Sequence, residues 1–468
     1  MRTRPEQVQA YRFITRRIVG ALLTGEPETN DMPMRRLANA LIGSVMVAAI
    51  VLAGIGVYGL VSPGGGKPEN GDLVAERETS SLYLYRDGTL LPMLNIASAR
   101  LAVGADAPVR YVSQASLRDL PRGATYGIPG APNSLPDRKD LRGLPWSVCS
   151  MARGQAVSGR MTVLHIGAEP GGGAALEKSA VVVKQADGGP AGKRYLLWND
   201  TKWEVDDLSL SALNLTAATP VPVGLAFLNA VTSKGKIAPP DVGDRTKNSS
   251  VKIKTKDAKI GTVYRAIGGD QRYVLLVNGL SPIGQVMAEM LQTGKPEELT
   301  ASEVSQANLV ASIDSAGFPQ QQPTLHQTNG DSALCAAYQG GDPNLSRALH
   351  VFDRAPALPS RVETSAVGST GGPGTADWVL LQGGSGALVR EQLRPDVAAE
   401  PTVYLITAQG VKYPLKEEAA TLLGYGNIAP VSVPADLLAL VPTGPTLDKA
   451  AAGQPITGAP GTTAGPPK

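Results

Sequence analysis

The amino-acid sequence predicts a mainly β protein with minor α-helix, attached to a membrane by a single N-terminal transmembrane helix. Three observations predict this fold class. One long segment near the N-terminus is apolar throughout, short apolar runs separated by glycine and proline fill most of the remaining chain, and the first and last of these regions share a residue pattern. We therefore expect the large C-terminal part to consist of repeated strand-rich units related by a pseudo-twofold.

The apolar segment runs from Ala40 to Val61, which is 22 consecutive residues without a charge. As a helix it would be about 33 Å long, and the hydrocarbon core of a bilayer is about 30 Å thick. A soluble core helix of this length would show a polar face, and here Ser44 is the only clearly polar residue. We expect a transmembrane helix over residues 37–62.

Positive charge is concentrated before this segment. Residues 1–36 hold seven arginines and four acidic residues, whereas the charges just after the span are mixed. Because Lys and Arg next to a span stay in the cytoplasm, we expect a single-pass protein of the cell membrane with a cytoplasmic N-terminus and an extracytoplasmic C-terminal domain. The apolar run is longer than a signal-peptide core, and Val61-Ser62-Pro63-Gly64 is a poor cleavage site, so a retained anchor fits better than a cleaved leader.

The cytoplasmic segment is predicted to contain an amphipathic helix over residues 5–24. Its apolar residues fall at helical spacing on one stripe, and three arginines lie off the centre of that stripe. Such a helix can lie against anionic headgroups or dock on a partner, and the plainer alternative is a purely topogenic role for its charge. The residues predicted to form this docking helix are Val8, Tyr11, Ile14, Arg16, Arg17 and Ile18, with Leu22 continuing the stripe.

Within the span, Ala49 and Ala53 form a small-xxx-small pair that lets another helix approach closely. Apolar spans contain such pairs often, so the pattern is a weak prediction of helix packing.

After the span, short runs of β-branched and aromatic residues alternate with turn residues, which is typical of strands and hairpins. Two short helices are expected as well, at Pro282–Leu291 and Ala435–Leu440. The predicted strands lie at Ser81–Tyr85, Ala180–Val183, Tyr195–Trp198, Tyr273–Val277, Trp378–Leu381 and Val403–Ile406. We expect a linker over 63–75, the extracytoplasmic domain over 76–444, and a disordered Gly/Pro-rich tail over 445–468.

The chain has two cysteines, Cys149 and Cys335, both after the span and 186 residues apart. An even count in an oxidising compartment predicts one disulfide, and the alternative is two buried free thiols that never meet. A CxxC or Cys/His zinc pattern is absent from the sequence.

An internal repeat relates the first and last folded segments at a constant offset of 322 residues. Two weaker copies lie between them, since Arg194–Asn199 resembles Arg272–Asn278. We expect four related units near 80–123, 190–235, 262–300 and 402–444, which present surfaces rather than one deep pocket. The residues Gly88, Pro92, Ala97, Leu101, Gly104, Ala107, Pro108 and Val109 recur as Gly410, Pro414, Ala419, Leu423, Gly426, Ala429, Pro430 and Val431.

The sequence contains only weak patterns of the kind that indicate catalysis or ligand binding. The net charge is 44 − 41 = +3, spread along the chain without a basic stripe, so nucleic-acid binding has no support. The three histidines, His165, His326 and His350, lack metal-ligand or catalytic spacing. Gly383–Ala387 departs from a nucleophile elbow and predicts a turn, and Gly188–Arg194 departs from a phosphate-binding loop. We expect no catalytic residue, no cofactor and no metal.

Several ordered stretches together resemble the EccB family of membrane components of actinobacterial type VII (ESX) secretion systems. Any one match is modest, but the set covers nearly the whole folded chain. The matching stretches are Gln7–Arg17, Ser62–Gly65, Glu76–Thr79, Asp87–Gly88, Leu94–Leu101, Gly127–Pro132, Trp146–Cys149 and Pro442–Pro445.

The resemblance implies a subunit of the secretion channel's membrane complex, working beside the EccC motor ATPase, the multi-span EccD subunit and EccE. It also implies an elongated outer domain in which repeats flank a central core, with the two cysteines in a disulfide. ATP hydrolysis is attributed to some members of the family, and this sequence offers no motif on which to place it. The function expected is therefore that of a structural subunit which self-associates and contacts lipid, with an anchored extracytoplasmic ATPase as the alternative.

Overall fold

The computed structural model describes residues 4–25, 33–61, 68–153, 159–186, 193–292, 294–314, 318–340, 347–358, 374–392 and 400–456. The chain divides into two compact bodies. The first comprises Met1–Leu91 and Pro108–Gly123, and the second comprises Pro92–Ala107 and Ala124–Lys468. Each body is described by itself.

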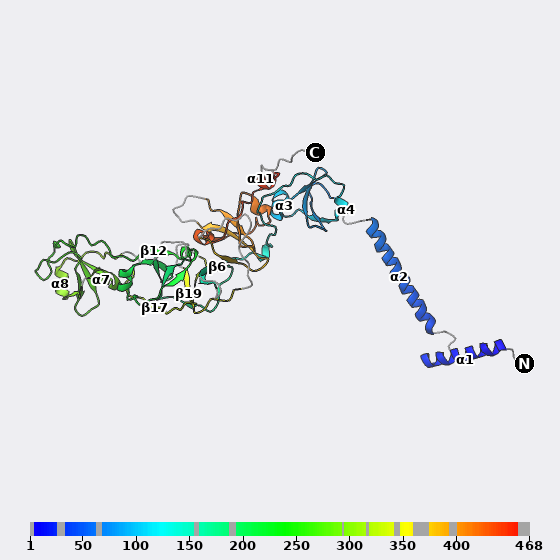
Figure 1. The fold of residues 1–468 in the computed structure, drawn as a ribbon, viewed down its shortest axis with the longest axis horizontal. Helices are drawn as coiled ribbons and strands as arrows, with labels where there is room; N and C mark the ends of the chain where they lie inside the picture. The colour runs from blue at the N-terminus through cyan, green and yellow to red at the C-terminus, as the bar shows by residue number, and fades with distance from the viewer. Residues whose placement is uncertain are drawn as a thin grey trace, which may run out of the picture. The chain divides into compact units, whose positions relative to one another are not determined.

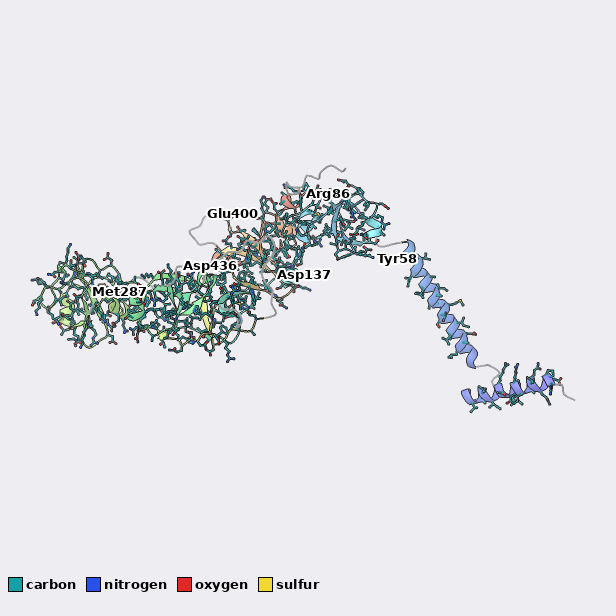
Figure 2. The ribbon with its side chains drawn as sticks, viewed as in Figure 1. Tyr58, Arg86, Asp137, Met287, Glu400 and Asp436 are labelled. Atoms are coloured by element: carbon teal, nitrogen blue, oxygen red, sulfur yellow. A yellow bond between two sulfur atoms is a disulfide. The ribbon has the colours of Figure 1, made fainter. Side chains whose placement is uncertain are left out.

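Two long helices open the chain (Figure 1). Helix α1 spans Arg4–Thr24 and helix α2 spans Pro33–Val61. Within α2, residues Leu37–Tyr58 are long and apolar enough to cross a membrane, and their side chains are not buried by protein. Tyr58 projects from this helix near its C-terminal end (Figure 2). Helix α2 thus agrees with the transmembrane segment predicted over 37–62.

Four units in the remaining chain share one order of elements, strand–strand–strand–helix–strand–helix. The first has β1 (Leu73–Glu76), β2 (Leu82–Arg86), β3 (Thr89–Pro92), α3 (Ile96–Val103), β4 (Val109–Val112) and α4 (Gln114–Leu117). The second has β8 (Ser179–Gln185), β9 (Arg194–Trp198), β10 (Thr201–Val205), α5 (Asp207–Ala212), β11 (Val221–Val223) and α6 (Leu225–Ala230). The third has β13 (Val263–Ala266), β14 (Arg272–Leu276), β15 (Gly279–Ile283), α7 (Gln285–Leu291), β16 (Glu297–Leu299) and α8 (Ala301–Gln306). The fourth has β21 (Ala387–Gln392), β22 (Val403–Ile406), β23 (Lys412–Leu415), α9 (Ala419–Leu422), β24 (Val431–Pro434) and α10 (Ala435–Leu438).

The strand order is also the same in all four repeats. The first strand of each unit pairs antiparallel with the second and parallel with the fourth, and the third strand lies beyond the second. Tight hairpins join the second and third strands. At Asp87-Gly88 and Asn199-Asp200 both turn residues have positive φ, which is the backbone that a two-residue hairpin loop requires. The shared topology confirms the repeat predicted from the sequence.

After its second helix, each unit returns along its own third strand and pairs with it in parallel. The second unit does this through β12 (Ser233–Lys236), which pairs with β10. The paired residues at equivalent places are Leu90 with Arg122, Lys202 with Ser233, Leu280 with Leu309, and Lys412 with Thr443. We call these four stretches the return segments. They cover the third-strand edge of every repeat.

A separate sheet forms the core of the second body, and its strands come from two stretches of the chain, one between the first and second repeats and one between the third and fourth. Its strand order is β20-β6-β5-β18-β19-β7. The strands are β5 (Trp146–Ala152), β6 (Arg160–Ile166), β7 (Ala174–Ala175), β18 (Ala333–Tyr338), β19 (Ala348–Phe352) and β20 (Trp378–Leu380). Three short elements complete the described chain: the 3₁₀ turn η1 (Arg138–Asp140), β17 (Thr324–Leu325) beside β8, and α11 (Lys449–Ala452).

The second and fourth repeats share one hydrophobic core with this central sheet, as Trp146, Phe227 and Leu437 illustrate. The first helices of the repeats pack in pairs. Helix α5 packs on α7, and the two helices contribute to one hydrophobic cluster that includes Met287 of α7. Met287 is labelled in Figure 2. Helix α3 packs on α9 in the same way, and the equivalent residues Ala97 and Ala419 are both buried there. This pairing of like helices agrees with the pseudo-twofold expected from the repeat.

The structure corrects several predicted boundaries. Strand β1 (Leu73–Glu76) lies mostly within the linker predicted over 63–75, and all four of its residues are buried. The first, second and fourth units begin one strand earlier than predicted, because β1, β8 and β21 precede the strands from which their boundaries were drawn. The helix predicted over Pro282–Leu291 begins at Gln285, since Pro282 and Ile283 end β15.

The tail prediction over 445–468 is wrong for its first part. Leu447 is fully buried, and its backbone N–H donates to the carbonyl of Pro414 at 2.8 Å. Helix α11 follows, capped by the Asp448 carboxylate, which accepts from the N–H of Ala450. These residues fold because the return segment of the fourth repeat continues through them. Residues 457–468 lie outside the described part of the chain.

Candidate assembly surfaces

Helix α1 exposes its predicted apolar stripe. Tyr11 is 74% exposed and Leu22 is 81% exposed, and Val8, Ile14 and Ile18 are also exposed. Phe13, which lies off that stripe, is exposed as well, and the Arg17 guanidinium stands 6.0 Å from the centre of its ring. The stripe alone does not reveal Phe13, since helical spacing places it on the other side of the helix. The helix therefore offers apolar contact on more than one face.

The span contributes a second surface. Ala49 and Ala53 lie one turn apart on α2, and neither side chain is covered by protein. The structure places no described side chain against this pair, so its packing role stays a prediction.

The predicted disulfide between Cys149 and Cys335 is present. The two residues face each other directly on the adjacent antiparallel strands β5 and β18 of the central sheet, and both are buried. The bond thus joins strands that are 186 residues apart in sequence. The alternative of two separate thiols is excluded.

A buried polar cluster joins the second and fourth repeats to the central sheet. Arg347 is 2% exposed, donates to the last carbonyl of α6 at Ala230, and binds both carboxylate oxygens of Asp436 on α10 at 2.7 and 2.9 Å. Lys202 donates to the carbonyl of Leu228 on the same helix end. Burial lowers the pKa of Lys202, although the Asp436 carboxylate opposes this shift. Two cations therefore satisfy carbonyls at the C-terminus of α6, where the helix dipole favours positive charge.

Lys412 occupies in the fourth repeat the position of Lys202 in the second. It is buried, donates to the carbonyl of Leu438 at the end of α10, and lies 5.6 Å from the centre of the Tyr404 ring. Burial lowers its pKa to about 8. The first and third repeats have Leu90 and Leu280 at this position. Sequence reasoning missed these buried lysines, because an isolated Lys normally indicates a solvated surface.

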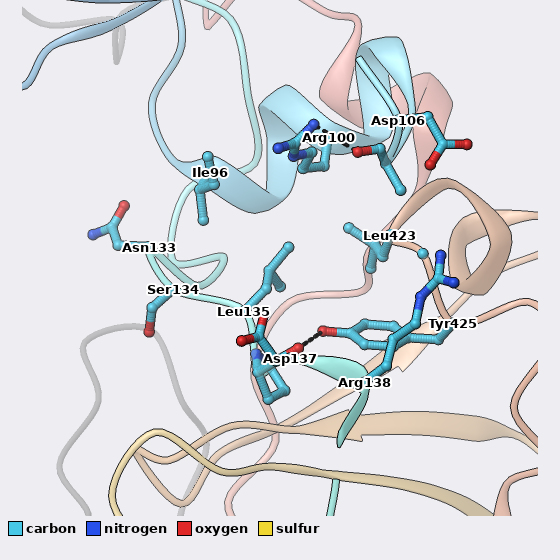
Figure 3. A pocket seen from close by; sticks show the side chains of 13 residues that line it. Ile96, Arg100, Asp106, Asn133, Ser134, Leu135, Asp137, Arg138, Leu423 and Tyr425 are labelled. Atoms are coloured by element: carbon cyan, nitrogen blue, oxygen red, sulfur yellow. Dashed lines mark hydrogen bonds between the residues drawn. The ribbon is translucent and has the colours of Figure 1, made fainter. Parts of the chain in front are cut away.

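A cavity of about 450 Å³ lies between the end of α3 and the turn after α9 (Figure 3). Arg100 crosses one wall and donates to the carbonyls of Ala105 and Ala107 at 2.8 and 2.7 Å. On the opposite wall, the Tyr425 hydroxyl donates to the carbonyl of Pro136 at 2.7 Å (Figure 3). Burial raises the pKa of Tyr425. Both side chains bind backbone carbonyls: Arg100 fixes the turn after α3, and Tyr425 holds the loop over 133–138 against the repeat.

The three histidines remain apart. His165 is buried in β6, and burial lowers its pKa to about 4. His350 lies 3.5 Å from the Glu169 carboxylate, and His326 donates its backbone N–H to Ala180. Within the described ranges, no three His, Cys, Asp or Glu side chains gather as metal ligands would.

Two glycine-rich motifs partly match a nucleophile elbow and a phosphate-binding loop. Ser385 donates its hydroxyl to the carbonyl of Gln382 and lies in a turn, which confirms the turn predicted for Gly383–Ala387. Residues 188–192 of the loop that resembles a phosphate-binding motif lie outside the described residues.

One stretch of the chain concentrates positive charge. Six basic residues and one acidic residue lie between Arg245 and Lys259, a local excess of 6 − 1 = +5 on a chain with a net charge of +3. This stretch is a basic run, and the expectation that positive charge is spread along the chain without a basic stripe is wrong here.

Over the described residues, these features define a membrane-attached protein with an apolar helix long enough to span a bilayer, repeated β units and a disulfide-linked sheet. The chain matches the family model described as "Type VII secretion system ESX-1, transport TM domain B" over residues 1–459. It therefore belongs to the EccB family of type VII secretion membrane proteins.

Curated relatives match almost their whole length. The chain is 26% identical over 468 residues to the ESX-3 secretion system ATPase EccB3 of Mycolicibacterium smegmatis, covering 95% of this chain and 89% of that protein. It is 27% identical over 463 residues to the ESX-1 secretion system ATPase EccB1 of Mycobacterium tuberculosis, covering 95% and 93%.

Solved structures share the fold. A chain of an intact ESX-5 inner membrane complex matches with a TM-score of 0.66 at 23% identity, covering 100% of this chain and 98% of that chain. A chain of the EccB3 dimer from the ESX-3 core complex matches with a TM-score of 0.63 at 25% identity, covering 81% and 99%.

Proposed function

We propose that this chain is a structural subunit of a type VII secretion complex, which helps assemble the channel and organises its extracytoplasmic side. Its partners would be the motor ATPase EccC, EccD, EccE, membrane lipid and further copies of itself. The observation that carries the proposal is family membership over residues 1–459, joined to a fold that offers surfaces at both ends of one apolar span.

The proposed topology places residues 1–36 in the cytoplasm and the repeat domain outside. The arginine-rich N-terminal side of the span supports this orientation. The disulfide between Cys149 and Cys335 supports it independently, because such bonds persist in oxidising compartments. A protease added to intact cells is expected to cleave the repeat domain. A reporter fused to the C-terminus that is active only in the cytosol would overturn the topology.

Assembly is proposed to depend on three separate elements. Helix α1 has exposed apolar residues at Tyr11, Ile14 and Ile18 that a partner's cytoplasmic domain or the headgroup region would cover. The repeat domain then packs against other copies, and the description of EccB3 as a dimer in the ESX-3 core complex supports self-association. Ala49 and Ala53 would support helix packing within the membrane.

Co-purification tests whether helix α1 is needed for assembly and dispensable for folding of the repeat domain. Deletion of residues 1–24 is expected to leave the repeat domain folded but to abolish co-elution of the motor and multi-span subunits in mild detergent. The single change Ile14→Asp, in the apolar stripe, should weaken co-elution, whereas Gln9→Asp adds the same charge on another face and should not. A native gel with an intact complex after the deletion would overturn the proposal.

The names of the curated relatives favour one second candidate, an extracytoplasmic ATPase anchored to the membrane. This candidate requires a defined pocket whose mutation removes activity. Purified full-length protein that hydrolyses ATP, and loses hydrolysis after a point mutation that leaves its melting temperature unchanged, would favour the ATPase over the scaffold.

A further inference from the structure

The basic run from Arg245 to Lys259 is folded onto the third repeat. Ile253 is buried against Tyr264, and the backbones of Ile253 and Lys256 bond each other in both directions at 3.0 and 2.9 Å. Ser249 also donates its N–H to the carbonyl of Ala258 at 2.9 Å. The lysines of this run are therefore held on a defined loop surface.

A cavity of about 490 Å³ opens beside this loop, between it and the end of α7. Arg245, Lys259 and Lys295 line it, and Glu297 is the one carboxylate among the described lining residues. The ionisable groups of the wall sum to 3 − 1 = +2. Such a volume accommodates a small ligand, and the charge fits a dianion.

Arg245 is held in place from behind. One of its terminal nitrogens donates to the carbonyls of Gly261 and Leu291. The side chain crosses Gly261, where an added Cβ would lie 2.6 Å from Nε of the arginine. Gly261 also has a positive φ of 83°, so glycine is favoured there on both grounds. The guanidinium is thus fixed against the wall of the cavity.

The other two cations of the wall have no ion-pair partner within the described ranges. Lys259 and Lys295 are both exposed, and no carboxylate of the described chain lies within salt-bridge distance of either. By contrast, Lys252 pairs with Asp257 at 3.7 Å outside the cavity. The positive charge that faces the cavity is therefore available to a ligand.

We propose that this cavity binds a phosphate-bearing anion, with Arg245, Lys259 and Lys295 as its cationic contacts. Guanidinium and ammonium groups bind phosphate oxygens through charge-assisted hydrogen bonds, and Arg supplies a planar fork for them. Lys252, Lys254 and Lys256 raise the local anion concentration without touching the ligand. The shared chemistry is a phosphate monoester or diester, whether it comes from a lipid headgroup or from a soluble molecule.

Calorimetric titration of pyrophosphate into full-length protein in phosphatidylcholine nanodiscs tests the site. Saturable binding is expected for the parent. The variant Lys259→Gln/Lys295→Gln should bind at least about tenfold more weakly, since it removes two charge-assisted contacts. The control Lys252→Gln/Lys256→Gln removes the same charge outside the cavity and should weaken binding less than about threefold, as expected for screened charges.

Flotation with phosphatidylglycerol vesicles, in competition with pyrophosphate, identifies the source. Competition assigns the cavity to headgroups, and binding of pyrophosphate without flotation assigns it to a soluble phosphate. The proposal is overturned if pyrophosphate shows no saturable binding, or if both double variants lose affinity equally while their melting temperatures match the parent. An equal loss of affinity in both double variants would mean that the basic run attracts anions in general and that the cavity is not a specific site.

Discussion

Arg347 and Asp436 bind each other through two hydrogen bonds, and this pair connects the central sheet to the first turn of α10 in the fourth repeat. The arginine is almost completely buried, whereas 41% of the aspartate side chain is exposed. The same guanidinium also donates to the end of α6 in the second repeat. One side chain thus links three separate parts of the second body.

Removing the aspartate charge is expected to destabilise this body. Asp436→Asn leaves the buried Arg347 without its counter-ion, and we expect a loss of about 2 kcal/mol in the free energy of unfolding, below the range for fully buried pairs because Asp436 is half exposed. Denaturant unfolding of the parent and the variant measures this loss. The exposed pair Lys449 and Glu418 gives a matched control, since Lys449→Gln should change stability by less than about 0.5 kcal/mol. Equal effects of both changes would contradict the structural role of Arg347.

The disulfide should contribute a large part of the stability of the second body. Cys149→Ser opens a loop closed across 186 residues of sequence separation, and we expect a loss of roughly 2–5 kcal/mol and a lower melting temperature. Thiol titration under denaturing, non-reducing conditions should find no free thiol in the parent and one, Cys335, in the variant. One free thiol per chain already present in the parent would argue against the bond.

His165 should make stability depend on pH on the acid side. Its pKa is about 4 in the folded protein, below the ordinary value of 6.5, because burial disfavours the charged ring. The contribution is complete above pH 6.5 and is lost as the pH falls from 6.5 towards 4, with an upper limit of about 3 kcal/mol. His165→Phe should flatten the melting temperature over this window relative to the parent. A parent and variant with parallel pH profiles would refute this assignment.

Lys412 should act on the alkaline side. Because its pKa is lowered to about 8 by burial, the unfolded chain binds more protons than the folded chain between pH 8 and the ordinary value of 10.5. Stability is therefore expected to rise with pH from about 8 to 9.5, before the tyrosines titrate. Lys412→Leu introduces the residue type found at Leu90 and Leu280 and should reduce this rise without unfolding the protein, while Lys202, whose pKa burial also lowers, keeps a part of it. An undiminished rise in the variant would show that Lys412 does not contribute to it.

Much of the fold could be predicted because it depends on local patterns. Runs such as Tyr195–Trp198 and Tyr273–Val277 are strongly β-forming and appear as β9 and β14. The offset of 322 residues relates Ala97 to Ala419, and both side chains are buried in the same hydrophobic cluster. The apolar span was equally clear, since no polar face interrupts it.

What sequence reasoning missed depends on tertiary contacts. Strand β1 is only four residues long and follows a Gly-rich tether, and its last residue, Glu76, is buried beside the hydroxyls of Thr79 and Tyr83, contacts that local pattern does not reveal. Leu447 lies in a Gly/Pro-rich stretch, and it is buried in a cluster that the fourth repeat forms with α3 and the loop at Ile128. From the sequence, Lys202 and Lys412 are expected at the surface. Their hydrogen-bond acceptors are the carbonyls at the ends of α6 and α10, which come close to them only after folding.

The return segments have a consequence for how copies of the protein can meet. A sheet whose terminal strand keeps free backbone groups is a template for fibre growth. Here each repeat occupies that strand with its own polypeptide, and the opposite terminal strands β4, β11, β16 and β24 are only three or four residues long. Contacts between copies therefore carry little risk of runaway cross-β aggregation and are left to side chains, which can be specific and finite in number.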